Sequence, residues 1–326
     1  METKRPTNPA AEEILGLYFP VLDHGFVSLV DYMGSDEDVE RAARVSYGYG
    51  TRKTSATRGL IRYLRRHRHT TPSEMVELKF HCAMPIFVAR QWIRHRTASV
   101  NEYSGRYSLL PLLYYTPDRA ELQAQSESNR QGRAGAPLDA LYADAVARWE
   151  RVRREASAGY EWMVGHDVAR ELARIDLPLS LYTQWYWKID LHNLLHFLSL
   201  RVDPHAQYEI RAFARVMAGM LQRVAPLSFE AWLDYDVAGT TLSRGELAAL
   251  RRLVHVRDGG LEAPAGRVTG AELEALGLAK REVDELLAKL AAAPTADDFA
   301  LDLSHARAPE AFAREMEAAV PTVDRR

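Results

Sequence analysis

The segment Arg94–Tyr107, which reads RHRTASVNEYSGRY, concentrates side chains that bind anions. Its fourteen residues include three arginines, one histidine, two serines, one asparagine and one glutamate. Each arginine offers a planar fork of N–H donors that suits a phosphate, and the backbone around Gly105 can add neutral donors. Glu102 can accept a bond from a ribose hydroxyl or orient an arginine. The composition indicates a binding segment for a nucleotide phosphate, with a solvated basic turn as the alternative.

A second pattern that could carry chemistry is a pair of histidines, His192 and His196, four residues apart on a predicted helix. This spacing places both rings on one helix face, as in the zinc motif H-E-x-x-H. The residues between them include no glutamate, and a third ligand is not obvious, although His205 is near in sequence. We therefore expect no metal site, and a metal-dependent hydrolase is the weakest of the functions considered.

Hydrophobic periodicity predicts the elements that position these residues. Strict alternation over Met75–Cys82 is typical of a half-buried strand, and Pro85 stands where a helix begins that would deliver Arg94 at its far end. Ser35 and Asp38 form a helix start that resembles a capping box. The further predicted strands cover residues 26–33 and 179–189, and the further helices cover residues 35–47, with a stop at Gly48–Gly50, 57–66, 138–164, 191–200 and 206–224.

Strands scattered among unequal helices, without a regular βαβ repeat, favour an α+β fold with a mixed or antiparallel sheet flanked by helices. No G-x-G-x-x-G motif follows a strand, so a Rossmann fold is not expected. Residues 1–239 are expected to form the catalytic domain, with a mobile loop over 118–136. Residues 240–326 are expected to form a helical appendage of unknown role, after a linker near Gly259–Gly266.

Composition limits the classes of partner. The chain has 326 residues, enough for one large domain or two smaller ones. Its 42 basic and 44 acidic residues give a net charge of -2, which argues against a general polyanion or membrane-surface binder. A single cysteine excludes an internal disulfide and a cysteine-cluster zinc site. With no secretory signal or membrane-length apolar run, we expect a soluble cytoplasmic protein.

The order of residues in the polar segment resembles one known family. The pattern R-H-R-x-x-S-x-N-E-x-S-x-R-Y is the signature of flavin-dependent thymidylate synthases, and all nine specified positions are present in Arg94–Tyr107. The text around the signature is similar to that family over about residues 24–238. The similar stretches are FVSLVDYMG at 26–34, ARVSYGYGT at 43–51, PIFVARQWIRHR at 85–96, LPLSLYTQWYWKIDLHNLLHFLSLR at 177–201 and HAQYEIR at 205–211.

This resemblance implies the synthesis of dTMP from dUMP. Methylenetetrahydrofolate would donate the carbon, and NADPH would reduce a bound FAD, which supplies the hydride. The resemblance also implies a homotetramer with active sites shared between subunits. For dUMP it implies contacts by Gln91, Arg94, Glu102, Ser104, Gly105, Arg106, Arg174 and Arg201, with Ser104 and Arg106 at the phosphate.

The same resemblance gives Arg201 the catalytic role. A fixed cation beside the uracil ring favours loss of the N3 proton and makes C5 more electron-rich. For FAD the resemblance implies contacts by Thr71, with His69 in the same segment, and by Arg94, His95, Arg96, Glu102, Asp190, His192 and His196. Without the resemblance, Arg174 and Arg201 would be interpreted as charges near helix ends.

Cys82 bears on the mechanism because thymidylate synthesis without flavin uses a cysteine nucleophile. It shares the apolar face of its predicted strand with Val76, Leu78 and Phe80, which favours a small buried hydrophobe over a reactive thiolate. Ser104 lacks an adjacent base that could activate it. We therefore expect a mechanism without an enzyme nucleophile, in which the protein supplies positioning and charge.

The main alternative is a nucleic-acid-binding protein. It depends on a basic run together with the signature arginines; the run comprises Arg52, Lys53, Arg58, Arg62, Arg65, Arg66 and Arg68. Much of that run falls on the helix predicted over 57–66, and such runs are usually solvated faces or substrate funnels. We expect neither nucleic acid nor a membrane as partner.

Overall fold

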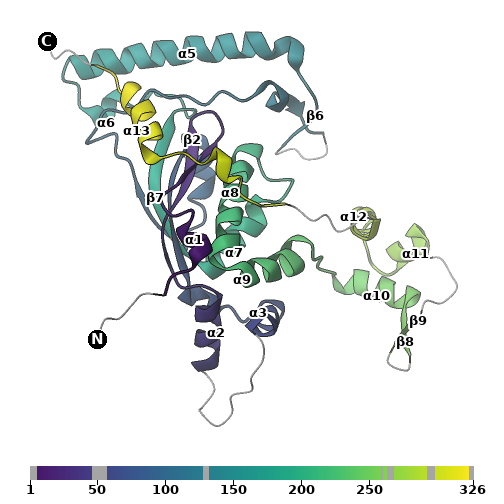
Figure 1. Ribbon diagram of the computed structural model, residues 1–326. Helices are drawn as coiled ribbons and strands as arrows, with labels where there is room; N and C mark the ends of the chain where they lie inside the picture. Colours follow the sequence, from purple (N-terminus) through teal and green to yellow (C-terminus); the bar gives the residue numbers. More distant parts are fainter. Residues whose placement is uncertain are drawn as a thin grey trace, which may run out of the picture. The chain divides into compact units, whose positions relative to one another are not determined.

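The computed structural model describes residues 6–45, 57–127, 132–257, 260–262, 268–291 and 298–322. The chain divides into two compact units. The first contains Met1–Ala231 together with Phe299–Arg326, and the second contains Trp232–Asp298. Figure 1 labels most of their helices and several of their strands. Part of the basic run (Arg52 and Lys53), the predicted stop at Gly48–Gly50, and part of the predicted linker (Gly259 and residues 263–266) lie outside the described residues.

The first unit is built on a five-stranded sheet in the order β1-β2-β3-β7-β4. Each neighbouring pair of strands is antiparallel. This sheet and its helices confirm the predicted α+β class. The strands are β1 (Tyr18–Val21), β2 (Gly25–Met33), β3 (Glu77–Pro85), β7 (Tyr182–Asp190) and β4 (Ser99–Glu102).

Helices of very different lengths surround this sheet in the first unit. The longest is α5 (Asp139–Gly165), as the 138–164 pattern predicts. The other α-helices are α1 (Pro9–Glu12), α2 (Asp36–Val45), α3 (Thr57–Arg66), α4 (Ile86–Trp92), α6 (Arg170–Ala173), α7 (Leu191–Arg201), α8 (Tyr208–Val224), α9 (Pro226–Trp232) and α13 (Pro309–Ala318). Short 3-10 helices are η1 (Thr71–Met75), η2 (Arg119–Glu121) and η4 (Leu303–His305).

Alternation along β3 separates the two faces of the sheet. Leu78, Phe80 and Cys82 are fully buried, whereas the intervening side chains are only partly covered, as the sequence predicts. On the buried face the indole of Trp92, the last residue of α4, lies 5.4 Å from Trp185 and 5.3 Å from Trp187 between ring centroids. This aromatic core fixes the end of α4, and therefore the place where the signature segment leaves the helix.

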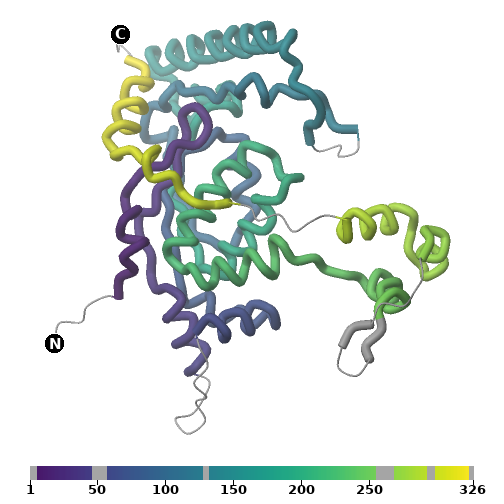
Figure 2. Tube along the Cα trace, turned by 45° about the vertical axis from the view of Figure 1, so that its right-hand side comes forward, coloured from purple at the N-terminus to yellow at the C-terminus, as the bar shows by residue number. Residues whose placement is uncertain are grey.

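The C-terminal helix α13 packs on the opposite face. The ring of Phe312 lies 4.9 Å from that of Phe26, and Arg307 exchanges backbone hydrogen bonds with Tyr18 of β1 at 2.8 and 3.0 Å. Figure 2 shows this yellow segment beside the purple N-terminal strands. The prediction of a single appendage over 240–326 is therefore wrong for its last part, because residues 299–322 belong to the first unit.

The segment 118–136, predicted to be a mobile loop, contains regular structure. Strands β5 (Gln123–Gln125) and β6 (Arg133–Pro137) pair as an antiparallel hairpin. Arg133 anchors it, since its Nη2 lies 2.9 Å from Glu121 and 3.1 Å from Glu209 of α8. The sequence did not predict these strands, because their residues are mostly exposed and form no alternating apolar face. Residues 128–131 lie outside the described residues.

The second unit is a small helical body with its own core. Its buried side chains are Ala249, Leu273, Leu278, Val283 and Leu286. Its elements are the π-helix η3 (Leu233–Val237), α10 (Arg244–Leu253), β8 (His255–Arg257), β9 (Gly260–Glu262), α11 (Gly270–Ala275) and α12 (Lys280–Ala291). Capping boxes start α10 and α11. Within the described residues of either unit, no helix is long and apolar enough to cross a membrane.

Candidate functional site

The signature segment leaves α4, turns, and forms the edge strand β4 against β7. Glu102 ends this strand, and its Oε1 accepts a hydrogen bond of 2.8 Å from the hydroxyl of Thr183 on β7. The turn after it carries Ser104, Gly105 and Arg106. The sequence predicts the polar function of this segment but not the strand, since Ser99–Glu102 lacks an alternating apolar face.

One group of predicted residues gathers where α4 and α7 end. Arg201 donates a hydrogen bond of 3.1 Å from Nε to Nε2 of His95, and the ring of His196 lies 6.1 Å from that of His95. Burial, helped by the charge of Arg201 and by His196, lowers the pKa of His95 to about 4. Burial also lowers the pKa of the Arg201 guanidinium. His95 is therefore a neutral imidazole that accepts a bond from a cation.

Arg94 and Arg96 flank His95 and are both exposed. The amide of Gln91, one turn back on α4, donates a hydrogen bond to the side chain of Gln207. Near the ends of α4 and α7, the predicted residues therefore offer a ligand two solvated guanidinium groups, one amide and the Arg201–His95 pair.

A second group forms around the turn after β4. Gly105 is buried, and a Cβ atom there would lie 3.0 Å from Leu110 and 3.2 Å from Cδ of Arg174. Glycine lets this backbone approach the two side chains without the crowding that a Cβ atom would cause. The hydroxyl oxygen of Ser104 accepts a bond of 3.3 Å from the backbone N–H of Arg106. The structure thus places the Arg174 side chain beside the turn that carries Ser104, Gly105 and Arg106.

An acidic residue that the sequence analysis did not single out meets this second group. Glu171 of α6 lies 2.9 Å from Nη2 of Arg106, and both side chains are about half exposed. The next residue back, Arg170, donates a bond of 2.6 Å to the carbonyl oxygen of Tyr107. Arg106 and Arg170 also line a pocket of about 320 Å³ together with Asp167. No local sequence pattern marks Glu171, because the pair joins residues 65 positions apart.

The three residues of α7 and its N-cap that are predicted to contact the flavin, Asp190, His192 and His196, differ from one another in burial and hydrogen bonding. The Asp190 carboxylate caps α7 by accepting from the backbone N–H of Asn193 at 2.9 Å and from its side-chain Nδ2 at 2.7 Å. Nδ1 of His192 is buried and has no hydrogen-bond partner in the described chain. His196 is exposed. Among the described residues, no group of three His, Cys, Asp or Glu side chains could hold a metal ion.

Thr71 lies apart from these contacts, at the start of η1. With His69 and Tyr63 it lines a largely apolar cavity of about 520 Å³ between α2, α3 and η1. The structure of a single chain thus places Thr71 in the lining of this cavity.

Cys82 is fully buried on the core face of β3, and burial raises the pKa of its thiol well above the ordinary value. A thiol in that environment stays protonated and unreactive. Ser104 has no hydrogen bond to a basic side chain among the contacts of the described residues. The geometry therefore offers no activated nucleophile at these two positions.

The basic run on α3 is partly neutralised. Arg62 lies 2.9 Å from Glu230 of α9, and Arg58 forms an ion pair with the same carboxylate. These two guanidinium groups join α3 to α9. Their charge is therefore balanced within the protein, which weakens the hypothesis that this run binds nucleic acid.

The comparisons with known proteins agree with the signature. A family model described as thymidylate synthase complementing protein matches residues 28–227. A flavin-dependent thymidylate synthase of Gluconobacter oxydans (strain 621H) is 53% identical over 294 residues, which are 88% of this chain and 92% of that protein. Another, from Rickettsia conorii, is 49% identical over 266 residues, or 78% and 90% of the two chains.

Among solved structures, the UMP/dUMP methylase PolB from Streptomyces cacaoi, bound with 5-Br UMP, is similar with a TM-score of 0.60. It is 34% identical, and the match covers 67% of this chain and 97% of that one. The fold and these similarities define a nucleotide-modifying enzyme of the α+β class. The chain belongs to the family of flavin-dependent thymidylate synthases.

Proposed function

We propose that this protein methylates dUMP to dTMP. Methylenetetrahydrofolate supplies a one-carbon unit to C5 of the pyrimidine, the C5 proton leaves, and a hydride that originates from NADPH completes the methyl group. The observation that carries the proposal is the close approach of the Arg174 side chain to the Ser104–Arg106 turn, which itself carries a second arginine and a hydroxyl. That set of donors suits the 5′-phosphate of a nucleotide.

The nucleotide is bound by residues from both groups. Ser104, Gly105, Arg106 and Arg174 hold the phosphate end, and Glu102 accepts from the ribose. Gln91 and Arg94 contact the other end. Thr183 supports this assignment, because its bond to one oxygen of Glu102 fixes the carboxylate and leaves lone pairs for a sugar hydroxyl.

Arg201 acts on the pyrimidine ring. A guanidinium that is half-buried interacts more strongly with a developing negative charge than a solvated one does. Neutral His95 accepts the bond from Nε and thereby orients the guanidinium while leaving its charge uncompensated. Arg201 then stabilises the uracil after loss of the N3 proton, which increases the electron density at C5 without covalent attack.

The residues present fit a flavin. His192 offers a buried Nδ1 that lacks a protein partner, and Arg94 and Arg96 offer exposed cations for an anionic cofactor. FAD would be held by Thr71, Arg94, His95, Arg96, Glu102, Asp190, His192 and His196, and when bound it supplies the hydride. At Asp190 the capping bonds occupy much of the carboxylate, so its contact uses the remaining lone pairs.

The active form is a homotetramer with sites shared between subunits. Large hydrophobic side chains are exposed in and beside the signature segment: Ile93 is 41%, Val100 40% and Tyr107 80% exposed. Burial against copies of the same chain would remove this apolar surface from water. Association of the subunits would also allow Thr71 of one subunit to reach a flavin bound by another.

The absorbance of the purified protein tests the proposed function. After reconstitution with FAD we expect a yellow protein whose flavin band bleaches with NADPH and shifts when dUMP is added. A protein that binds no flavin but retains RNA would contradict the proposal and favour the nucleic-acid alternative.

A further inference from the structure

The side chain of Gln207 occupies an unusual position for its place in the fold. Gln207 is the N-cap residue of α8, yet its side chain makes no capping hydrogen bond. Instead its Oε1 accepts from Nε2 of Gln91, and its own Nε2 donates to Oε2 of Glu209 at 2.8 Å. One planar amide therefore joins the helix that precedes the signature segment to a carboxylate in the first turn of α8.

Glu209 is a rigid anchor for this amide. Its side chain is only 3% exposed, and its Oε1 accepts from the hydroxyl of Tyr115 and from Nη1 and Nη2 of Arg133, each at 3.1 Å. A buried carboxylate whose charge and lone pairs are satisfied in this way has little freedom to move. The oxygen that it presents to Gln207 is thus held in one place.

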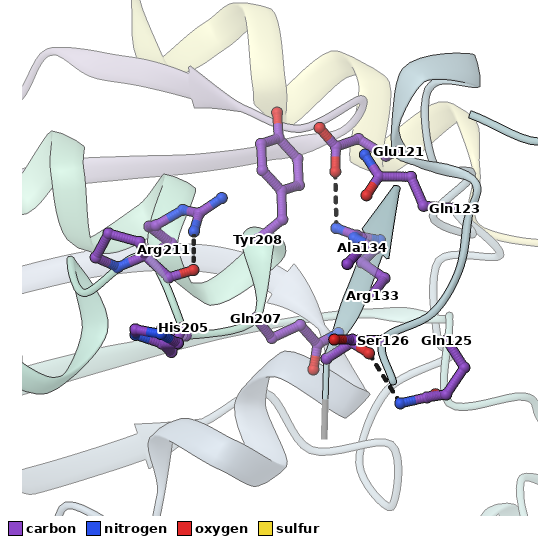
Figure 3. A pocket seen from close by; sticks show the side chains of 13 residues that line it. Glu121, Gln123, Gln125, Ser126, Arg133, Ala134, His205, Gln207, Tyr208 and Arg211 are labelled. Carbon is purple, nitrogen blue, oxygen red and sulfur yellow. Dashed lines mark hydrogen bonds and ion pairs between the residues drawn. The ribbon is translucent and has the colours of Figure 1, made fainter. Parts of the chain in front are cut away.

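The cation that balances Glu209 comes from the β5–β6 hairpin. Figure 3 shows Arg133 and Glu121 joined by an ion pair on one wall of a pocket, with Gln207 and Tyr208 on the facing side. The pocket has a volume of about 590 Å³. The Arg133 guanidinium also lies 5.4 Å from the centre of the Tyr208 ring, within the range of a cation–π contact. The hairpin is therefore connected by polar contacts to the residues that hold Gln91.

We propose that Gln207 and Glu209 are positioning residues that orient the amide of Gln91 toward the pyrimidine nucleotide, and that Arg133 links the hairpin to this orientation. The inference rests on the proposed function, which places Gln91 against dUMP. An unrestrained glutamine side chain loses rotamer freedom when it binds a ligand. Gln207 engages one N–H of Gln91 beforehand and leaves its second N–H and its carbonyl oxygen to the nucleotide.

The test is the Gln207→Ala variant, measured as dUMP affinity by calorimetry and as dTMP formation. Gln207 is exposed and makes no capping bond, so the substitution leaves the fold intact. We expect the dissociation constant and the KM for dUMP to rise about three- to tenfold, the effect of losing one hydrogen bond, with kcat changed less than twofold. Unchanged dUMP affinity would overturn the proposal.

Tyr115→Phe is the matched control for the anchor. It removes the hydroxyl that bonds to Oε1 of Glu209 but leaves the bond between Gln207 and Oε2. We expect a lower melting temperature and a rise in the KM for dUMP smaller than that of Gln207→Ala, because Arg133 still holds Oε1 of Glu209. An increase as large as that of Gln207→Ala would mean that general loosening of α8, rather than orientation of Gln91, controls affinity, and would overturn the proposal.

A double-mutant cycle separates this inference from the function on which it rests. In a Gln91→Ala background, adding Gln207→Ala should change dUMP affinity less than twofold, because the group being oriented is gone. If Gln207→Ala lowered dUMP affinity equally in the wild-type and Gln91→Ala backgrounds, the positioning role would be contradicted. Wild-type protein that binds no dUMP would instead contradict the proposed function itself.

The variant Arg133→Met tests whether Arg133 links the β5–β6 hairpin to the orientation of Gln91. It leaves the Glu209 carboxylate without its cation, so we expect weaker dUMP binding that again depends on Gln91. Affinity equal to that of the wild type would overturn the assignment of Arg133 while leaving the result for Gln207 to stand by itself.

Discussion

Arg201 donates a hydrogen bond from Nε to Nε2 of His95 over 3.1 Å. This bond joins the signature segment to the end of α7, two stretches that are 106 residues apart in sequence. It also assigns the tautomer of His95: because Nε2 is the acceptor, the proton of the neutral ring is on Nδ1. A cation is thus held by a neutral partner, which orients Arg201 without cancelling its charge.

Replacing Arg201 by lysine tests whether this geometry matters as well as the charge. Lysine keeps the positive charge but loses the planar fork and the Nε donor to His95. We expect dTMP formation to fall about 100-fold or more, the usual effect of removing an electrostatic group at a reacting centre. The fraction of FAD bound, measured by absorbance, should stay near that of the wild type. Undiminished dTMP formation would remove Arg201 from the catalytic role.

The pKa of His95 predicts a pH dependence of stability. Its pKa falls from the ordinary 6.5 to about 4 in the folded protein. Between these values the unfolded chain binds more protons than the folded chain, so stability decreases as the pH is lowered from about 6.5 toward 4. The variant His95→Gln cannot titrate. Its melting temperature should decline less than that of the wild type over this interval, and parallel curves would contradict the assignment.

If Arg106 binds the nucleotide phosphate as proposed, its ion pair with Glu171 competes with that phosphate. Removing its charge by Glu171→Gln should lower the dissociation constant for dUMP about two- to fivefold at low salt, since half-exposed ion pairs are weak. Salt should reduce this gain. Glu285→Gln is the matched control, because Glu285 forms a 2.9 Å pair with Arg281 in the other unit. A gain of equal size in that control would show a net-charge effect instead of local competition.

Cys82 should be dispensable for the reaction. Its thiol is buried and protonated, so Cys82→Ala removes packing rather than a nucleophile. We expect about 1–2 kcal/mol lower stability in denaturant unfolding. At a temperature where the variant is folded, dTMP formation should remain within about twofold of the wild type. Loss of turnover together with a covalent Cys82–pyrimidine adduct in mass spectrometry would contradict the mechanism.

The sequence predicted a feature correctly where the residues of one short segment determine that feature by themselves. The alternation over Met75–Cys82 predicted β3 and the burial of Cys82, because burial on one sheet face imposes that period. The signature predicted the family, which the family model and the relatives confirm, because its nine positions are fixed by residue type. Pro85 marked the start of α4 for a similar local reason.

Sequence reasoning failed where an element depends on residues that are distant in the sequence. Edge strand β4 exists because β7 supplies its ladder, and the hairpin over 123–137 is held by the ion pairs of Arg133. The return of residues 299–322 to the first unit depends on Phe312 meeting Phe26 across most of the chain length. The contacts of Gln207 with Gln91 and of Glu171 with Arg106 also join distant residues, and no local pattern in the sequence marks them.

Formation of dTMP with each component withheld in turn tests the central claim most directly. Reactions contain dUMP, FAD, NADPH and methylenetetrahydrofolate, and release of tritium from C5-labelled dUMP is followed alongside the product. We predict that dTMP forms only in the complete mixture and that omitting any one component abolishes it. Formation of dTMP by flavin-free protein without NADPH would contradict the account.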